Sequence, residues 1–231
     1  MDISNELRFE LKAAVTRALQ KLRGEFPLQA RIEGAQPTLQ AAYAGILCHW
    51  IRAAEAPGAR IAPQALLDTL SAMDAIVNDE QGIGCYPFSA RKTEIRVHFS
   101  GKSVHAMCAI DALAIPRMVR QASRITARCA VCRCHLACAV AANGSVEKEN
   151  QNPDAARVVW EPDAGGGHAC CNSLCPGIGF VCQHCTASAG ALAFSLPQAS
   201  AVGNAFFAFQ MKLLTQYPAC GQPALLAWPA A

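Results

Sequence analysis

The first eighty residues carry apolar side chains at the three- and four-residue spacing that is typical of helices with one buried face. In the first such stretch, residues 4–23, the apolar positions are Leu7, Leu11, Val15, Ala18 and Leu22. Ser4 or Asn5 can cap the start of this helix, and Gly24 and Pro27 end it.

Two further helices are predicted, over 38–54 and over 64–77, each bounded by proline or glycine. Three short helices followed by a turn and a strand resemble a winged-helix unit, a fold that often binds DNA. The third helix offers Asp68 and Asp74 and no Lys or Arg, so a packing role is favoured over DNA recognition. We therefore predict that residues 1–80 form a helical, winged-helix-like accessory region.

The hydrophobic period changes after Ile83, where apolar and polar residues alternate as in a half-buried strand. The clearest case is residues 94–99, in which Ile95, Val97 and Phe99 alternate with charged or histidine side chains. The remaining predicted elements are a hairpin-type turn at 100–103, strands at 136–142 and 157–160, and a closing helix at 206–217. The predicted fold class is α+β: the N-terminal helical segment is followed, over 81–231, by a mixed β-sheet core with flanking helices.

Charge and hydropathy argue against two kinds of partner. A net charge of +3 over 231 residues is too weak to indicate nucleic-acid binding. The chain has no run of 18 apolar residues, and its first residues, Met1 to Arg8, lack the apolar core of a signal peptide. We expect a cytoplasmic protein that binds neither nucleic acid nor membrane.

Cysteine is the unusual component of the sequence. The chain has 13 cysteines, an odd number, and ten of them lie between Cys108 and Cys185. A secreted disulfide framework favours an even count and a shorter chain, so we expect free thiols in a reducing compartment. A dense set of thiols indicates soft-metal binding or thiolate catalysis.

Cys108 and Asp111 are three residues apart, at the start of an apolar run that implies a helix. If Asp111 lies in the first turn of that helix, the two side chains share one face. A thiolate can bind a soft metal, and a neighbouring carboxylate can carry a proton. A buried cysteine beside an N-capping aspartate would give the same spacing.

Other cysteines have the spacing of metal ligands. These are Cys129-x-x-Cys132, followed by Cys134 and Cys138, and Cys182-x-x-Cys185 at the end of a stretch, 170–185, with five cysteines and one histidine. Two such pairs can close a four-thiolate zinc site, although a separation of about 50 residues is longer than common zinc ribbons use.

The segment from Val104 to Pro116 resembles the central motif of the organomercurial (alkylmercury) lyases, a MerB-like family. The motif has Cys-Ala, an aliphatic residue, Asp and an apolar run ending in Pro, and 13 residues match it without a gap. Cys129 stands where the family has a further cysteine, and 175–180 fits its Cys-x-x-aliphatic-x-Phe frame. The segment 199–206 resembles the family's Gly-containing final segment. The resemblance covers about 81–215, and residues 1–80 loosely.

The resemblance implies that the protein cleaves carbon–mercury bonds by protonolysis, giving a hydrocarbon and Hg(II). The family's catalytic set of two cysteines and an aspartate falls on Cys108, Asp111 and Cys175, which would also hold the mercury of substrate and product. Cys170 and Cys171, just ahead of Cys175, remain alternatives for the second cysteine. The other cysteines, Cys132, Cys134, Cys138, Cys182 and Cys185, receive no role from the resemblance.

The implied chemistry needs no organic cofactor, only a thiol reductant that removes the product, and a structural zinc would be additional. The expected partners are organomercurial small molecules, with mercuric reductase or cytosolic thiols as acceptors of Hg(II). An alternative function is a thiolate-rich binder of mercury, copper or zinc on the same fold, without lyase activity. A metal-responsive regulator that binds DNA through residues 1–80 is disfavoured by the missing basic helix.

Overall fold

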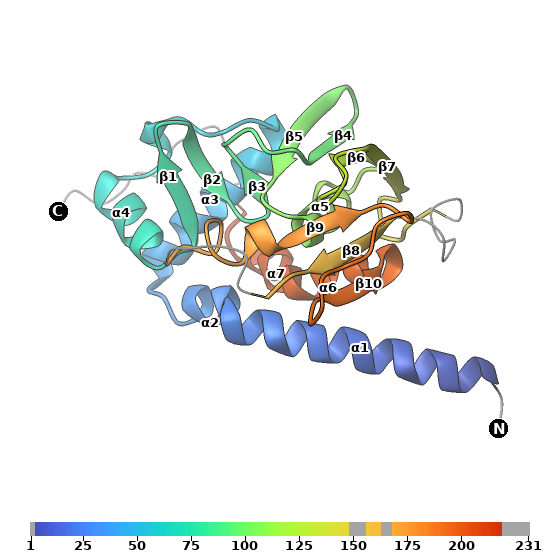
Figure 1. The fold of residues 1–231 in the computed structure, drawn as a ribbon. Helices are drawn as coiled ribbons and strands as arrows, with labels where there is room; N and C mark the ends of the chain where they lie inside the picture. The colour runs from blue at the N-terminus through green and yellow to red at the C-terminus, as the bar shows by residue number, and fades with distance from the viewer. Residues whose placement is uncertain (1–2, 148–155, 163–167, 219–231) are drawn as a thin grey trace.

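The computed structural model describes residues 3–147, 156–162 and 168–218, with side chains from residue 12 onward. The predicted α+β class is confirmed: helices come first, and two antiparallel sheets with further helices follow (Figure 1). The N-terminal helices are α1 (Ile3–Glu25), α2 (Leu28–Glu33), α3 (Pro37–Ala53), the 3-10 helix η1 (Ala59–Ile61) and α4 (Gln64–Ala72).

The first two predicted helices are confirmed by α1 and α3, but the third ends earlier than predicted. Asp74, placed inside it by the sequence, has a left-handed backbone with φ 52°, and the helix stops at Ala72. Ile76 and Val77 belong instead to β1 (Ile76–Asp79), because β-branched side chains favour an extended chain, which here pairs with β2. The six-residue helix α2 was not predicted.

The larger sheet is antiparallel, with the strand order β1-β2-β3-β5-β4-β6-β7. After β1, its strands are β2 (Gly82–Cys85), β3 (Phe88–Ser89), β4 (Arg96–Phe99), β5 (Lys102–Ala106), β6 (Ser123–Arg128) and β7 (His135–Val140). The strand predicted over 94–99 is confirmed by β4, and the one predicted over 136–142 by β7. A turn at Ser100-Gly101 joins β4 to β5, as the sequence predicts.

The smaller sheet is also antiparallel and has the order β10-β8-β9. Its strands are β8 (Arg157–Trp160), β9 (Ile178–Val181) and β10 (Leu192–Ser195), and the helices after β5 are α5 (Ala109–Val119), α6 (Leu196–Phe206) and α7 (Ala208–Gln216). The predicted strand over 157–160 and the closing helix are confirmed by β8 and α7. Helix α6 was missed, although Ser195 and Gln198 form a capping box at its start, which is a sequence signal for a helix N-terminus.

Helix α5 is the centre of the fold. Every one of its side chains except Arg117 is buried, which is typical of a helix in a protein interior. It packs on β4, β5 and β6 of the larger sheet, on β9 of the smaller sheet, and on α6. Helix α1 lies along one side of the molecule next to α6 (Figure 1). Helix α5 is therefore in contact with both sheets.

Helix α6 crosses α5 at Gly203, where there is no room for a side chain. A Cβ atom at Gly203 would lie 2.7 Å from the carbonyl oxygen of Ile110 and 3.2 Å from the Cβ of Ala114. We expect Gly203→Ala to lower the free energy of unfolding in urea by about 1–3 kcal/mol, because α6 must move away from α5. The control is Gly45→Ala in α3, where a Cβ meets nothing within 4 Å and alanine favours the helix by up to about 1 kcal/mol. Equal losses in both variants would contradict the close crossing.

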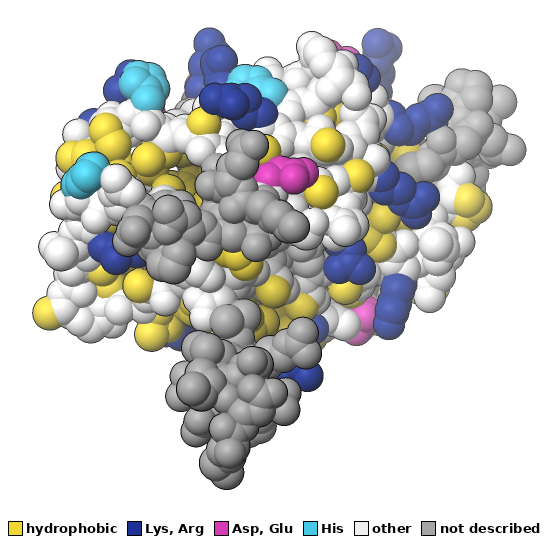
Figure 2. Space-filling view, turned by 90° about the vertical axis from the view of Figure 1, so that its right-hand side faces the viewer, with side chains coloured by type: hydrophobic (Ala, Val, Ile, Leu, Met, Phe, Trp, Pro, Cys, Tyr) yellow, Lys and Arg dark blue, Asp and Glu magenta, His cyan; other side chains and the backbone are white. Residues whose placement is uncertain are grey.

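None of the helices among the described residues combines the length and the apolar character that a membrane span requires. On the face shown in Figure 2, Lys and Arg side chains stand singly or in small groups with uncharged surface between them. The described part of this face therefore offers no continuous basic stripe of the kind that binds nucleic acid.

Candidate active site

The chain changes from strand to helix at Cys108, and this change positions the first two site residues. After β5 ends at Ala106, Cys108 keeps an extended backbone and forms the N-cap of α5, whose first turn contains Asp111. The N–H of Asp111 donates a hydrogen bond to Cys108 Sγ over 3.4 Å. The predicted helix start is confirmed, with the cysteine rather than the aspartate as its cap.

Cys175 reaches the same place from the smaller sheet. It is the first residue of the 3-10 helix η3 (Cys175–Gly177), which leads directly into β9. Its thiol donates to Asp111 Oδ2 over 3.9 Å, across 64 residues of sequence. The sulfur and oxygen atoms of Cys108, Asp111 and Cys175 lie within 4.8 Å of one another, and all three side chains are buried. The structure thus brings the three predicted site residues together.

The two alternative cysteines lie just ahead of Cys175, at different depths. Cys170 is buried, and its Sγ lies 3.6 Å from that of Cys175, so it borders the three-residue group. Cys171 is half-buried, and its N–H donates to the hydroxyl of Tyr86 over 3.0 Å. Of these contacts, the one that reaches the carboxyl of Asp111 comes from Cys175.

Asp74 and Tyr86 form hydrogen bonds to the segment that carries Cys170 and Cys171, roles that the sequence does not predict. Asp74 Oδ2 accepts a hydrogen bond from the N–H of Cys170 over 3.0 Å, and Asp74 Oδ1 accepts one from the Tyr86 hydroxyl over 3.0 Å. Arg31 of α2 forms an ion pair with the same carboxylate at 3.4 Å. The N-terminal region therefore supports the segment that leads to Cys175. The left-handed backbone conformation of Asp74 could not be predicted from the sequence.

A small apolar pocket lies over the three residues. Besides the thiols and the carboxyl, its lining consists of Leu22, Phe26, Tyr86, Ile110, Leu174, Ile178 and Phe206. Leu22 belongs to α1 and Phe206 to α6, so one wall is built from helices at the two ends of the chain. The surface that the pocket presents is mostly hydrocarbon.

Burial changes the protonation of the three site residues. It raises the pKa of Asp111 to about 7, although hydrogen bonds from Cys108 and Cys175 lower that pKa in part. Burial also raises the pKa of Cys108 to about 11. Hydrogen bonds with the thiols of Cys108 and Cys170, together with burial, raise the pKa of Cys175. Near neutral pH both thiols keep their protons, and the carboxyl can accept or donate one.

The structure brings a second group of cysteines together outside this pocket. The sulfur atoms of Cys129, Cys132, Cys134 and Cys182 lie within 4.8 Å of one another. Segments that are 50 residues apart in the sequence are therefore neighbours in space. Cys138, by contrast, lies on β7 opposite Ile125 of β6.

Comparison with known proteins identifies the family to which the chain belongs. Residues 88–207, just over half of the chain, match the family described as MerB, alkylmercury lyase. The chain belongs to the alkylmercury lyase family. The matched range includes Cys108, Asp111 and Cys175, so the resemblance seen in the sequence is confirmed where the site lies.

A solved structure described as the mercury-bound form of MerB2 has a similar fold. The two sequences are 19% identical, the TM-score is 0.60, and the alignment covers 83% of this alkylmercury lyase family member and 99% of the other chain. Likeness at this level of identity establishes the common fold. No curated protein sequence matches the chain.

Proposed function

We propose that this protein cleaves the carbon–mercury bond of organomercurials by protonolysis, releasing a hydrocarbon and Hg(II). The observation that carries the proposal is the meeting of two buried thiols and a buried carboxyl within 4.8 Å, in a member of the alkylmercury lyase family. Mercury is a soft metal that prefers thiolates to water or carboxylate. The apolar lining of the pocket suits the organic group of the substrate.

The first proposed step exchanges the ligand that mercury carries into the site. A substrate R–Hg–X, in which X is a small thiolate, meets the thiol of Cys108. A mercury–sulfur bond forms, and X leaves with the thiol proton as a free small thiol. Cys108 is assigned this step because the N–H of Asp111 points at its sulfur and stabilises the thiolate character of the ligand.

The second step moves one proton from Cys175 to the carbon of the substrate. The Cys175 thiol gives its proton to the Asp111 carboxylate over their 3.9 Å contact, and its sulfur binds mercury. The protonated carboxyl then donates this proton to the carbon. The electron pair of the carbon–mercury bond becomes the carbon–hydrogen bond, and Hg(II) stays on two thiolates. A carboxyl whose pKa is about 7 suits both transfers, because neither protonation state is strongly disfavoured at neutral pH.

Release of hydrocarbon into the headspace tests the proposal. We expect methane or benzene from methyl- or phenylmercury when the purified protein is incubated with excess small thiol, which also carries away Hg(II). Cys108→Ser should reduce the rate to the uncatalysed level, because a serine hydroxyl is a poor ligand for mercury. The matched control is Cys138→Ser, at a buried cysteine on β7, which should keep the wild-type rate. Wild-type rates from Cys108→Ser would overturn the assignment.

The second cysteine cluster favours another candidate function, in which the protein binds mercury, copper or zinc without breaking carbon bonds. A simple binder has no need of a carboxyl beside its thiols, so this function leaves Asp111 without a role. In the same experiment, mercury retained by the wild-type protein with no hydrocarbon released would replace the lyase proposal with this one.

A further inference from the structure

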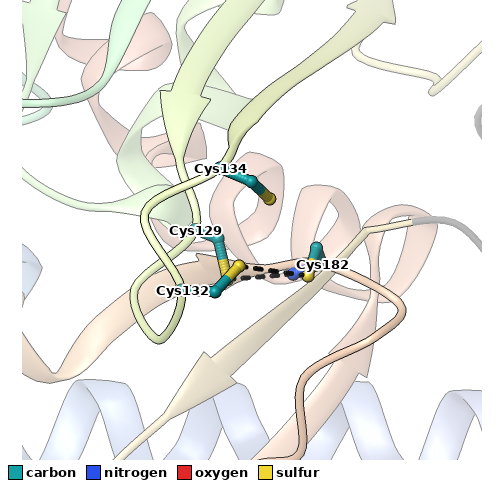
Figure 3. A group of neighbouring side chains, drawn as sticks. All are labelled: Cys129, Cys132, Cys134 and Cys182. Atoms are coloured by element: carbon teal, nitrogen blue, oxygen red, sulfur yellow. Dashed lines mark hydrogen bonds between the residues drawn. The ribbon is translucent and has the colours of Figure 1, made fainter.

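Four cysteines gather where the loop between β6 and β7 meets the end of β9 (Figure 3), and a fifth, Cys185, follows nearby in the chain. Cys129, Cys132 and Cys134 belong to that loop, Cys182 directly follows β9, and Cys185 comes three residues later. The thiols of Cys129 and Cys132 point toward Cys182 (Figure 3). All five are free cysteines, and Cys132 and Cys134 are exposed.

The sulfur–sulfur distances in the cluster suit a tetrahedral metal better than a disulfide. In a tetrahedral zinc site with Zn–S bonds of about 2.3 Å, neighbouring sulfurs lie about 3.8 Å apart. The Sγ atoms of Cys132 and Cys182 are 3.7 Å apart, and the four sulfurs of the group lie within 4.8 Å. A disulfide would need a distance of about 2.05 Å and would join only two of them.

Backbone N–H groups surround the sulfur of Cys129. It accepts a hydrogen bond from the N–H of Cys182 over 3.3 Å, and further ones from the N–H groups of Cys132 and Val131. Arg133 has φ 64°, and its N–H donates to the carbonyl oxygen of Cys129 over 3.0 Å, which closes the turn that contains Cys132. Donors aimed at the sulfur of Cys129 stabilise a thiolate, the form that binds metals.

Each cysteine thiol that binds a divalent metal ion would release its proton to solvent. No electron transfer is involved.

Three arginines lie near the cluster, and two of them, Arg128 and Arg133, form ion pairs with Glu94 at 3.3 and 3.2 Å. Arg133 lies inside the loop, and Arg128 donates to its carbonyl oxygen over 3.2 Å. Arg157 donates from Nη2 to the carbonyl oxygen of Cys185, and its buried Nε has no hydrogen-bond partner among the described residues.

A small hydrophobic group lies beside the cluster. Cys129, Val159, Val181 and Cys182 form a buried group separate from the main core. One backbone hydrogen bond, from the N–H of Ala130 to the carbonyl of Phe180 over 2.8 Å, joins the loop to β9.

We propose that Cys129, Cys132, Cys134 and Cys182 bind one zinc ion as four thiolates, with Cys185 as an adjacent fifth thiol. Zinc is the metal that tetrahedral four-cysteine sites most often hold, and it is redox-inert. The ion would tie the β6–β7 hairpin of the larger sheet to β9 of the smaller sheet. Because η3 with Cys175 lies at the other end of β9, the zinc would also anchor the strand that positions this cysteine. The zinc site does not depend on the lyase activity.

Metal analysis of the full chain tests the proposal. Protein purified from zinc-containing medium, without chelators, should contain about one zinc ion per chain. Exchange of the zinc for Co²⁺ should give intense sulfur-to-cobalt charge-transfer bands and the visible bands of tetrahedral cobalt, and removal of zinc by a chelator should lower the melting temperature. Protein without zinc that also fails to take up added Zn²⁺ or Co²⁺ would overturn the proposal.

Single substitutions test the ligand set. Cys132→Ser, at an exposed residue that the core does not need, should lose the zinc, as should Cys134→Ser. Cys185→Ser and the matched control Cys138→Ser should keep it. Loss of zinc from Cys185→Ser with retention in Cys134→Ser would overturn the choice of Cys134. If HgCl₂ fills the cluster while Zn²⁺ in excess does not, the site is a mercury store and the zinc assignment is wrong.

Discussion

Asp111→Asn is expected to stop hydrocarbon release while mercury binding persists. Asparagine keeps the shape of the side chain and the backbone N–H that donates to Cys108 Sγ, but it cannot carry a proton between Cys175 and carbon. Loss of a general acid–base group slows a reaction by about 10²–10⁴-fold. The rate is measured by headspace analysis, and bound mercury by metal analysis after gel filtration.

Asp68→Asn on α4 is the matched control, because its exposed carboxyl contacts only Gln64 among its described hydrogen bonds. This variant should cleave organomercurials at the wild-type rate. Equal loss of cleavage and of mercury binding in Asp111→Asn would contradict the proton-carrier role, because it would make the carboxyl a mercury ligand or a structural support.

The stability of Asp111→Asn separates a chemical defect from a folding defect. The pKa of Asp111 is about 7 in the folded chain, against 3.8 for a free carboxyl. Between these values the unfolded chain loses the proton first, so the wild type loses stability as the pH rises from about 4 to 7, by at most about 4 kcal/mol. Asparagine does not titrate. The free energy of unfolding of Asp111→Asn, measured in urea, should therefore rise relative to that of the wild type between pH 4 and pH 8. If the difference between the two free energies does not change with pH, the result would argue against a buried carboxyl with a raised pKa.

The sequence predicts the local part of this site well, because the local part depends on short-range chemistry. Cys108 and Asp111 are three residues apart at a helix start, so their shared face follows from helix geometry once the helix is recognised. Cys175 could be predicted only from the Cys-x-x-aliphatic-x-Phe motif of the family, because the residues that flank it in the sequence do not indicate that η3 packs beside α5. The same limit left Cys170 and Cys171 open as alternatives.

The parts that the sequence did not predict depend on contacts between distant segments. Asp74 looks like a helix residue, and only the pairing of Ile76 with β2 turns the chain so that its carboxylate reaches Cys170. Leu22 fits the apolar face of a helix equally well whether it packs in a core or lines a pocket. The cysteine cluster is an intermediate case. The sequence offers Cys129, Cys132, Cys182 and Cys185 as a four-thiolate set, whereas the structure groups Cys134, rather than Cys185, with the other three.

Cys175→Ser and Cys170→Ser are expected to differ by orders of magnitude in cleavage rate. Cys175 contacts the carboxyl that carries the proton, so its loss removes both a mercury ligand and the proton source. We expect a decrease on the order of a thousandfold or more. Cys170 contacts Cys175 rather than Asp111 in the described contacts, so Cys170→Ser should stay within a few-fold of the wild type. Headspace rates with methylmercury measure both variants.

Cys171→Ser is the control for this pair, because it keeps the backbone N–H that donates to Tyr86, and a serine hydroxyl can replace the hydrogen bond between the Cys171 thiol and Tyr86. Retention of Hg(II) against a small competing thiol adds a second readout. Two thiolates hold Hg(II) far more tightly than one, so Cys175→Ser should release mercury at much lower thiol concentration than the wild type does. If Cys170→Ser were the inactive variant and Cys175→Ser the active one, Cys170 would be the second mercury ligand, and the segment to which Asp74 and Tyr86 form hydrogen bonds would belong to the catalytic geometry itself.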